Sequence, residues 1–207
     1  MAADNPPARP PGRPMDVTLD AAILAAAQRH LGERGYTGMS IQGVAAAAGT
    51  SAPSLRRRYR DKLELAMASI DAMQTQPLPA KAKDPRAEIL AILRNTHDTM
   101  ITGNGLAILA AVVTEQTRHP ELLANFRRQI VDPLRARLLH ALSAGVETGQ
   151  LPAGVDLDTR VSMLTGSLYA HYLDGQPLPE DWSERALHVI WPASPTRPTH
   201  SAGTHPA

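Results

Sequence analysis

Apolar residues recur at spacings of three and four along nearly every stretch between the two ends of the chain. This period is typical of helices with one buried face, and no segment shows the sustained alternation of a half-buried strand. The first stretch places Ile23, Ala27 and Leu31 on one face, with Thr18 as a suitable N-cap and Gly35 as a stop. The pattern therefore predicts an all-α fold.

Three more helices follow closely in the N-terminal third. Ser40 is a suitable cap for the second helix, Ser51 for the third and Asp61 for the fourth, which extends to about residue 74. In the rest of the chain the same spacing predicts helices over residues 86–102, 106–118, 121–148, 156–173 and 180–191, with a kink at Pro133.

Prolines gather near both ends and in a polar break between the two groups of helices. Five prolines lie in the first fourteen residues and four in the last sixteen, a composition that favours extended, unpacked chain. We therefore expect disordered tails over residues 1–16 and 193–207, a helical domain over 17–74, a linker over 75–85 and a second helical domain over 86–192.

Residues 41–59 have the spacing of a helix, a glycine turn and a second helix. Val44 and Ala45 belong to an apolar stripe, and Gly49 suits the positive φ that ends a helix. Ser51 can cap the next helix almost at once. Helices joined so tightly cross steeply, which requires a small side chain such as Ala45 at the crossing. The segment therefore predicts a helix-turn-helix unit.

The second helix of this unit has an apolar face and a basic one. Leu55 and Tyr59 are four residues apart and can seat the helix, while the opposite side holds Ser54, Arg57 and Arg58, with Arg56 on the flank. Arginine pairs with guanine edges and also binds phosphates, so this face suits the major groove of duplex DNA. Basic residues also complement the C-terminal dipole, so the arginine run alone leaves a solvated helix end open.

Composition narrows the class of partner. The formal net charge is only +1, yet residues 56–62 hold five basic residues against one acid, so the positive charge is local. Aromatic residues make up 3% of the chain, which argues against a stacking platform for single strands. Cysteine is absent, which excludes thiol chemistry. Without a signal-type segment or a long apolar run, we expect a cytoplasmic protein with no membrane partner.

Two pairs of polar residues superficially resemble catalytic or metal-binding groups. They are His97 with Asp98 and Glu115 with His119. A helical pair of this kind lacks the further ligands of a metal site, and no glycine-rich phosphate loop is present. We therefore predict no enzyme activity, no metal and no cofactor.

With these elements placed, the chain resembles transcriptional regulators of the tetracycline-repressor (TetR) family. LDAAILAAAQRHLGERGY, MSIQGVAAAAG, TSAPSLRRRY and DKLEL match the four ordered helices of the family's DNA-binding domain, and QTRHPELLANFRRQIVDPLRARL and GVETGQLPAGVDLD are similar to stretches of its C-terminal half. The resemblance implies an N-terminal three-helix helix-turn-helix DNA-binding domain followed by a helical ligand-binding and dimerisation domain.

The resemblance also implies contacts to a double-stranded DNA operator. They map to Ser40, Thr50, Ser51, Ser54, Arg56, Arg57 and Lys62, with Tyr59 a packed aromatic first and a phosphate contact second. Arg56 is expected mainly to hold the DNA backbone, Lys62 a phosphate and Arg57 a base. Arg58 is expected on the flank of these DNA contacts. Arg9 and Arg13 fit either a minor-groove arm or an idle tail.

Dimerisation is required because one helix in one groove makes too few contacts for specific recognition. The resemblance implies a homodimer through the last two helices. Apolar residues at suitable spacing there are Val161, Leu164, Leu168, Leu187, Val189 and Ile190, although packing within the chain gives the same stripe. Candidates for a pocket that binds a small-molecule effector are His97, Met100, Val113, Phe126, Ile130, Met163 and Tyr169, each also consistent with plain core.

The favoured function is a dimeric repressor released from a palindromic operator by a small hydrophobic effector. Two alternatives stay open. One is a ligand-independent regulator or an activator with the same DNA-binding domain. The other is a helical protein-interaction module whose basic face docks an acidic partner.

Overall fold

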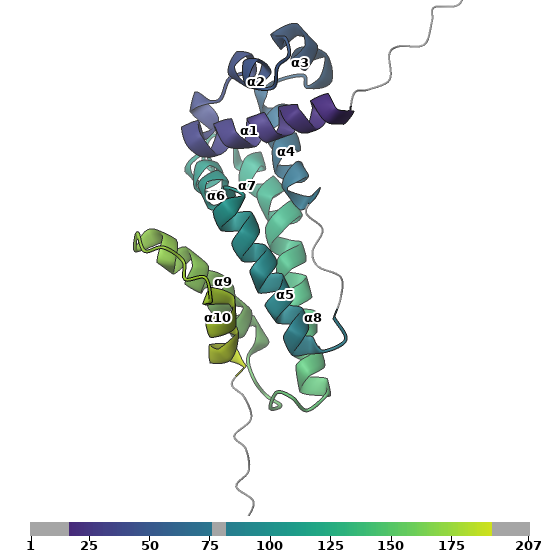
Figure 1. Cartoon of the computed structure of the whole chain (residues 1–207), viewed down its shortest axis with the longest axis vertical. Helices are drawn as coiled ribbons and strands as arrows, with labels where there is room; N and C mark the ends of the chain where they lie inside the picture. Colours follow the sequence, from purple (N-terminus) through teal and green to yellow (C-terminus); the bar gives the residue numbers. More distant parts are fainter. Residues whose placement is uncertain (1–16, 76–81, 192–207) are drawn as a thin grey trace, which may run out of the picture.

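The computed structural model describes residues 17–75 and 82–191, and every regular element among them is a helix or helical turn (Figure 1). The prediction of an all-α fold is confirmed. The predicted tails and residues 76–81 of the predicted linker lie outside the described residues, and so do Arg9 and Arg13.

The N-terminal helices are α1 (Val17–Gly38), α2 (Ile41–Ala47), α3 (Ala52–Arg58) and α4 (Lys62–Asp71), with the 3-10 turn η1 (Ala72–Thr75) after α4. Within α1, Gly35 has φ 67° and ψ 174°, so the regular helix stops at the glycine that the sequence indicated. Residues 36–38 form one further turn, which lies against the C-terminal half of the molecule.

The C-terminal helices are α5 (Pro85–His97), α6 (Gly105–Thr114), α7 (Pro120–Phe126), α8 (Asp132–Glu147), α9 (Leu157–Leu173) and α10 (Trp182–Ile190). Two wider π-turns, η2 (Asp98–Thr102) and η3 (Arg127–Val131), follow α5 and α7. The irregularity expected at Pro133 takes the form of η3. Proline donates no N–H, and its ring crowds the carbonyl four residues back, which a wider turn relieves.

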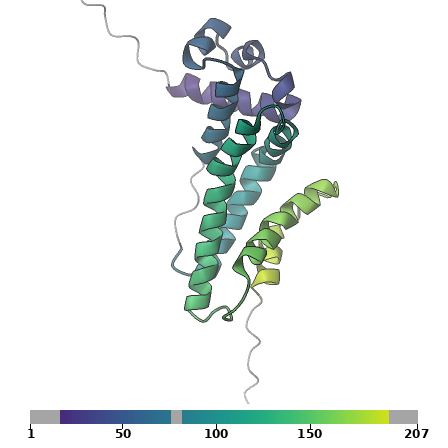
Figure 2. The ribbon, with the colours of Figure 1, turned by 180° about the vertical axis from the view of Figure 1, so that it is seen from behind.

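The helices form an elongated molecule with α2 and α3 at one end (Figure 1). Helix α1 lies across the end of the C-terminal bundle and contacts α6, while α4 contacts α7. Helices α5 and α8 pack along each other, and α9 and α10 flank them on one side (Figure 2). The buried apolar side chains form one continuous cluster through both halves, so the first four helices pack directly against the C-terminal helices.

Candidate nucleic-acid interface

The turn between α2 and α3 has the geometry that the sequence predicts. Gly49 has φ 67°, and the backbone N–H of Thr50 donates to the carbonyl of Ala45 over 2.9 Å. This positive φ is inexpensive only for glycine. Ala45 is buried, 2% exposed, as a close crossing of the two helices requires. The helix-turn-helix unit is therefore formed locally, by a glycine and a small side chain.

Side chains cap the helices on both sides of this turn. The Ser40 hydroxyl accepts the N–H of Gly43 over 3.1 Å, and the Ser51 hydroxyl accepts the N–H of Ser54 over 3.3 Å. Ser40 and Ser51 are exposed. A hydroxyl that accepts a hydrogen bond still has its own proton to donate, so both serines can cap a helix and also donate to a phosphate.

Helix α3 is seated by very few side chains. Leu55 is its one fully buried residue, and Tyr59, just after the helix, is half-buried against the core. Burial raises the pKa of the Tyr59 hydroxyl above its ordinary value. The burial of Leu55 and Tyr59 agrees with their expected seating role, and leaves the rest of α3 on the surface.

The three consecutive arginines of α3 have different surroundings. Arg56 and Arg57 are exposed. The Arg58 Nε donates to the Asp20 carboxylate on α1 over 2.7 Å, and its Nη1 donates to the Ser54 hydroxyl over 3.0 Å. Sequence reasoning put Arg58 on the flank of the DNA contacts but missed its partner, because Asp20 lies 38 positions away with no local signal.

Lys62, at the start of α4, contacts the turn that follows Gly35. Its ammonium donates to the Tyr36 carbonyl over 2.9 Å and lies 4.2 Å from the centre of the Tyr36 ring. The edge of that ring meets His119, with 4.6 Å between the ring centres. The same ammonium lies 3.5 Å from the Thr37 carbonyl, so two of its three N–H donors connect α4 to α1 and one remains for a phosphate.

The residues that sequence analysis offered for an effector pocket have unequal exposure. Met100 and Phe126 are buried in the core, and His97, Ile130 and Tyr169 are partly buried. Burial raises the pKa of the Tyr169 hydroxyl. Val113 is 41% exposed and Met163 is 53% exposed, so these two side chains lie at the surface.

The polar pairs considered as catalytic groups have structural contacts. Glu115 accepts a hydrogen bond from the Thr37 hydroxyl over 2.7 Å, and His97 lies 3.3 Å from the Asp98 carboxylate. Across residues 17–75 and 82–191, no three histidine, cysteine, aspartate or glutamate side chains gather as they would around a metal ion. Nor has any helix in these ranges the length and apolarity needed to cross a bilayer.

The last two helices divide their apolar residues between an inner and an outer face. Of the six residues at suitable spacing for a partner helix, Val189 is 68% exposed, and the five that are buried inside the chain are Val161, Leu164, Leu168, Leu187 and Ile190. Those five are core. The outer face of α9 includes Met163, Ala170 and Leu173 instead.

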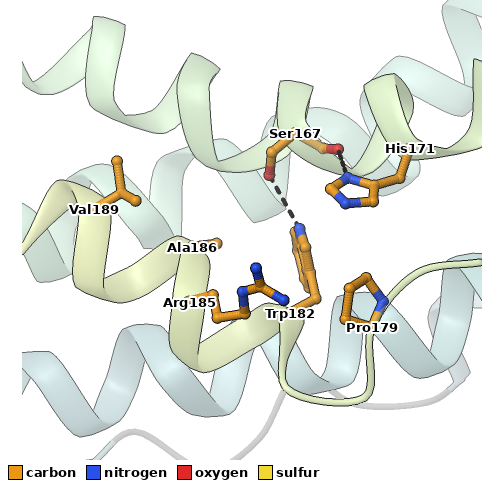
Figure 3. Close-up of a pocket in the computed structure, with 7 residues that line it drawn as sticks. All are labelled: Ser167, His171, Pro179, Trp182, Arg185, Ala186 and Val189. Carbon is orange, nitrogen blue, oxygen red and sulfur yellow. Dashed lines mark hydrogen bonds between the residues drawn. The ribbon is translucent and has the colours of Figure 1, made fainter. Parts of the chain in front are cut away.

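A small pocket of about 150 Å³ lies between α9 and α10 (Figure 3). The indole N–H of Trp182 donates to the Ser167 hydroxyl over 3.1 Å and so joins the two helices. Pro179, Ala186 and Val189 give the pocket a mainly apolar lining, and His171 and Arg185 add polar side chains to it. None of the effector residues that the sequence suggested is among the residues that line this pocket.

These features define a class of protein: an N-terminal helix-turn-helix DNA-binding domain on a helical C-terminal domain. Comparison with known families agrees, since residues 23–68 match the family model for "Bacterial regulatory proteins, tetR family" and residues 79–190 match "Tetracyclin repressor-like, C-terminal domain". The chain belongs to the TetR family of transcriptional regulators. This membership identifies a DNA-binding regulator rather than an enzyme.

Individual relatives are distant. An HTH-type transcriptional regulator of Mycobacterium tuberculosis is 26% identical over 199 residues, which cover 95% of this chain and 96% of that protein. The structure of MexZ, a repressor of Pseudomonas aeruginosa, has a TM-score of 0.67 at 23% identity and covers 84% of this chain and 92% of its own. FadR of Bacillus subtilis, solved with stearoyl-CoA, has a TM-score of 0.64 at 18% identity, with 84% and 98% covered. At these identities the two structures show a shared fold.

Proposed function

We propose that this regulator is a homodimeric repressor that binds a palindromic operator and releases it when a small hydrophobic effector binds the C-terminal domain. The observation that supports this most directly is the exposure of Arg56 and Arg57 on α3, at the end of the molecule, beside a helix face seated by Leu55. Such a helix offers paired donors to the major groove while its other face is fixed.

The proposed contacts divide by chemistry. Arg57 reads a base edge, and Arg56 holds the phosphate backbone. Ser40, Thr50, Ser51 and Ser54 supply neutral donors from the caps, the turn and the start of α3, while Lys62 and secondarily Tyr59 contribute phosphate contacts at the edge. Because the phosphate contacts are independent of sequence, specificity depends mainly on Arg57 and its neighbours on α3.

Two copies are proposed to meet through α9 and α10. Met163, Ala170 and Leu173 place exposed side chains along one face of α9, and a Cβ added at Gly166 would meet nothing within 4 Å. Val189 adds an exposed apolar side chain on α10, where it lines the pocket of Figure 3. Burial of an exposed apolar face is the main driving force for such an association.

The effector is proposed to enter between the helices of the C-terminal domain. Met100, Phe126 and Ile130 place apolar side chains in the core on η2, α7 and η3. Of the other residues that the sequence indicates, His97 and Tyr169 are partly buried, whereas Val113 and Met163 lie at the surface, Met163 on the proposed dimer face. FadR was solved with stearoyl-CoA, which supports a hydrophobic ligand class for this fold. Displacement of α6 by a ligand would reach α1 directly, because the two helices pack together.

Selection of bound duplexes from a random pool, with the purified full-length chain, tests the operator and the dimer together. We expect an enriched inverted repeat whose half-sites lie one helical turn or a multiple apart. A pool without enrichment, from a chain that still binds an acidic protein, would overturn the proposal and favour the interaction module.

Stearoyl-CoA provides a first probe of the effector, with coenzyme A alone as its control. Release of the enriched duplex by stearoyl-CoA but not by coenzyme A supports a hydrophobic effector. Retention of the duplex with both compounds removes long-chain acyl-CoA esters from the candidates. Transcription from a promoter that contains the enriched repeat distinguishes a repressor from an activator.

A further inference from the structure

The third arginine of α3 is engaged inside the protein. Arg58 and Asp20 form an ion pair of 2.7 Å between Nε and a carboxylate oxygen, and their side chains are only 21% and 23% exposed. The same guanidinium donates through Nη1 to the hydroxyl of Ser54, one turn earlier on α3. Arg58 therefore links α3 to the start of α1 and at the same time holds the Ser54 hydroxyl of its own helix.

Apolar packing holds α3 along one face only, where Ala52 and Tyr59 are partly buried beside Leu55. The helix has seven residues, and Leu55 is the only one that is fully buried. So short a helix has little stability by itself and takes its orientation from tertiary contacts. A guanidinium held on two sides provides a directional contact, because its donors lie in a fixed plane.

The bond from Arg58 also decides how the Ser54 hydroxyl acts. Its oxygen accepts from Arg58, while its own proton remains available. Ser54 therefore presents a donor to a ligand. The acceptors available on duplex DNA are the O6 and N7 atoms of guanine, N7 of adenine, O4 of thymine and the phosphate oxygens.

We propose that Arg58 is a positioning residue: held by Asp20, it fixes the orientation of α3 and aims the Ser54 hydroxyl as a donor at a DNA acceptor, and it does not itself bind a phosphate. This inference rests on the proposed DNA contacts of α3. It assigns a role in operator specificity to Asp20, an acidic residue on a helix that precedes the helix-turn-helix unit.

Replacement of Asp20 separates the two roles of Arg58 by the sign of the effect. If Arg58 were a phosphate contact, Asp20→Ala would free it, strengthen binding and steepen the dependence of affinity on salt. If Arg58 positions α3, Asp20→Ala lowers the ratio of operator to nonspecific affinity about 10-fold. This is the order of the change in an equilibrium constant when a hydrogen bond to a charged group is lost. The slope against salt concentration then stays at its wild-type value.

The experiment measures the affinity of the full-length dimer for the enriched duplex and for a scrambled duplex across a range of salt concentrations. Glu33→Gln is the matched control, because it removes one negative charge from the exposed side of α1 without touching Arg58. Arg58→Lys keeps the charge but lacks the fork, and it should reproduce the loss of specificity at an unchanged slope. Circular dichroism confirms that each variant is folded.

Ser54→Ala identifies the acceptor. The acceptor is a base edge if Ser54→Ala and Asp20→Ala both relax the preference for the same base position. In that case the double variant should relax it no further. A uniform loss over all sequences assigns a phosphate. A rise in affinity with Asp20→Ala, or wild-type specificity in both Asp20→Ala and Arg58→Lys, overturns the inference. Loss of enrichment by the unmodified chain would instead overturn the proposed function itself.

Discussion

The Thr37 hydroxyl donates a hydrogen bond of 2.7 Å to the carboxylate of Glu115, across 78 positions of sequence. Thr37 belongs to the turn after Gly35, and Glu115 follows α6 and is buried, 6% exposed. Beside this bond, the ring of Tyr36 meets His119 and accepts Lys62 on its face. The turn after Gly35 is therefore the joint between the DNA-binding domain and the C-terminal domain.

Replacement of Thr37 by valine should weaken this joint. The buried Glu115 carboxylate loses its hydroxyl donor, so we expect the free energy of unfolding in urea to fall by about 1–2 kcal/mol. Thr114→Val is the control, because the exposed hydroxyl of Thr114 donates to the Ala110 carbonyl of its own helix. Equal losses in the two variants would contradict a special role for the joint.

Arg57 and Arg56 should differ in how their loss affects operator binding. Arg57→Ala is expected to cost about 1–3 kcal/mol on the operator and to relax preference at one base position in each half-site. Arg56→Ala should weaken all sequences alike and reduce the slope of log affinity against log salt by about one per protomer. Titrations of operator and scrambled duplex at several salt concentrations measure both effects, and interchanged behaviour would reverse the two assignments.

The stability of the DNA-binding domain should fall at mildly acidic pH because of His30. Its Nδ1 has no hydrogen-bond partner among the described residues, and burial, followed by the charge of Arg34, lowers its pKa below the ordinary value of 6.5. His30 therefore binds a proton more readily in the unfolded chain than in the folded chain, so the free energy of unfolding falls as the pH drops below 6.5. His30→Gln should flatten the dependence of the unfolding midpoint on pH in this window, and a variant that keeps the wild-type dependence would contradict the assignment to His30.

The proposed dimer predicts that an exposed leucine is needed for association. Leu173 is 80% exposed, so Leu173→Glu should leave the protomer folded while a charge opposes burial of the α9 face. Sedimentation should show a monomer at concentrations where the parent chain is dimeric. Val17→Glu makes the same change at a residue 78% exposed on α1, and its dissociation to a monomer would speak against an interface through α9.

Gly145 is expected to resist substitution because of Trp191. A Cβ at Gly145 in α8 would overlap with the six-membered ring of Trp191, which is 3% exposed after α10. Gly145→Ala should therefore reduce the free energy of unfolding by about 1–3 kcal/mol, as overpacked cores do. The loss should be smaller in a Trp191→Leu background. An equal loss in both backgrounds would trace the effect to the backbone of α8.

Features encoded by neighbouring residues were predictable from the sequence. Gly49 and Ser51 fix a turn and a cap through their own backbone preferences, and Asp61 caps α4 through the N–H of Glu64, three residues on. The family resemblance placed these elements in a DNA-binding domain. The exposure of Arg57 also followed from its position opposite Leu55, and that of Arg56 from its position on the flank of the helix.

Features that depend on distant partners were not predictable in the same way. Apolar periodicity cannot distinguish a face buried inside the chain from one buried against a second copy, so Val161 and Leu164 fitted both until their burial was known. The pairs Arg58 with Asp20 and Thr37 with Glu115 join residues 38 and 78 positions apart, and no local preference indicates either. Pro133 likewise predicted an irregularity in this part of the chain, but the sequence did not predict that it would take the form of the wider turn η3.

Leu55, the one fully buried residue of α3, packs the helix against the core, whereas other residues of α3 are proposed to contact DNA. The core is contacted by Ala52, Leu55 and Tyr59, whereas Arg56 and Arg57 are exposed. Exposed positions of this kind tolerate most substitutions at little cost in stability. The helix can therefore be recoded for a new operator, in evolution or by design, by exchange of a few outward side chains on an unchanged scaffold.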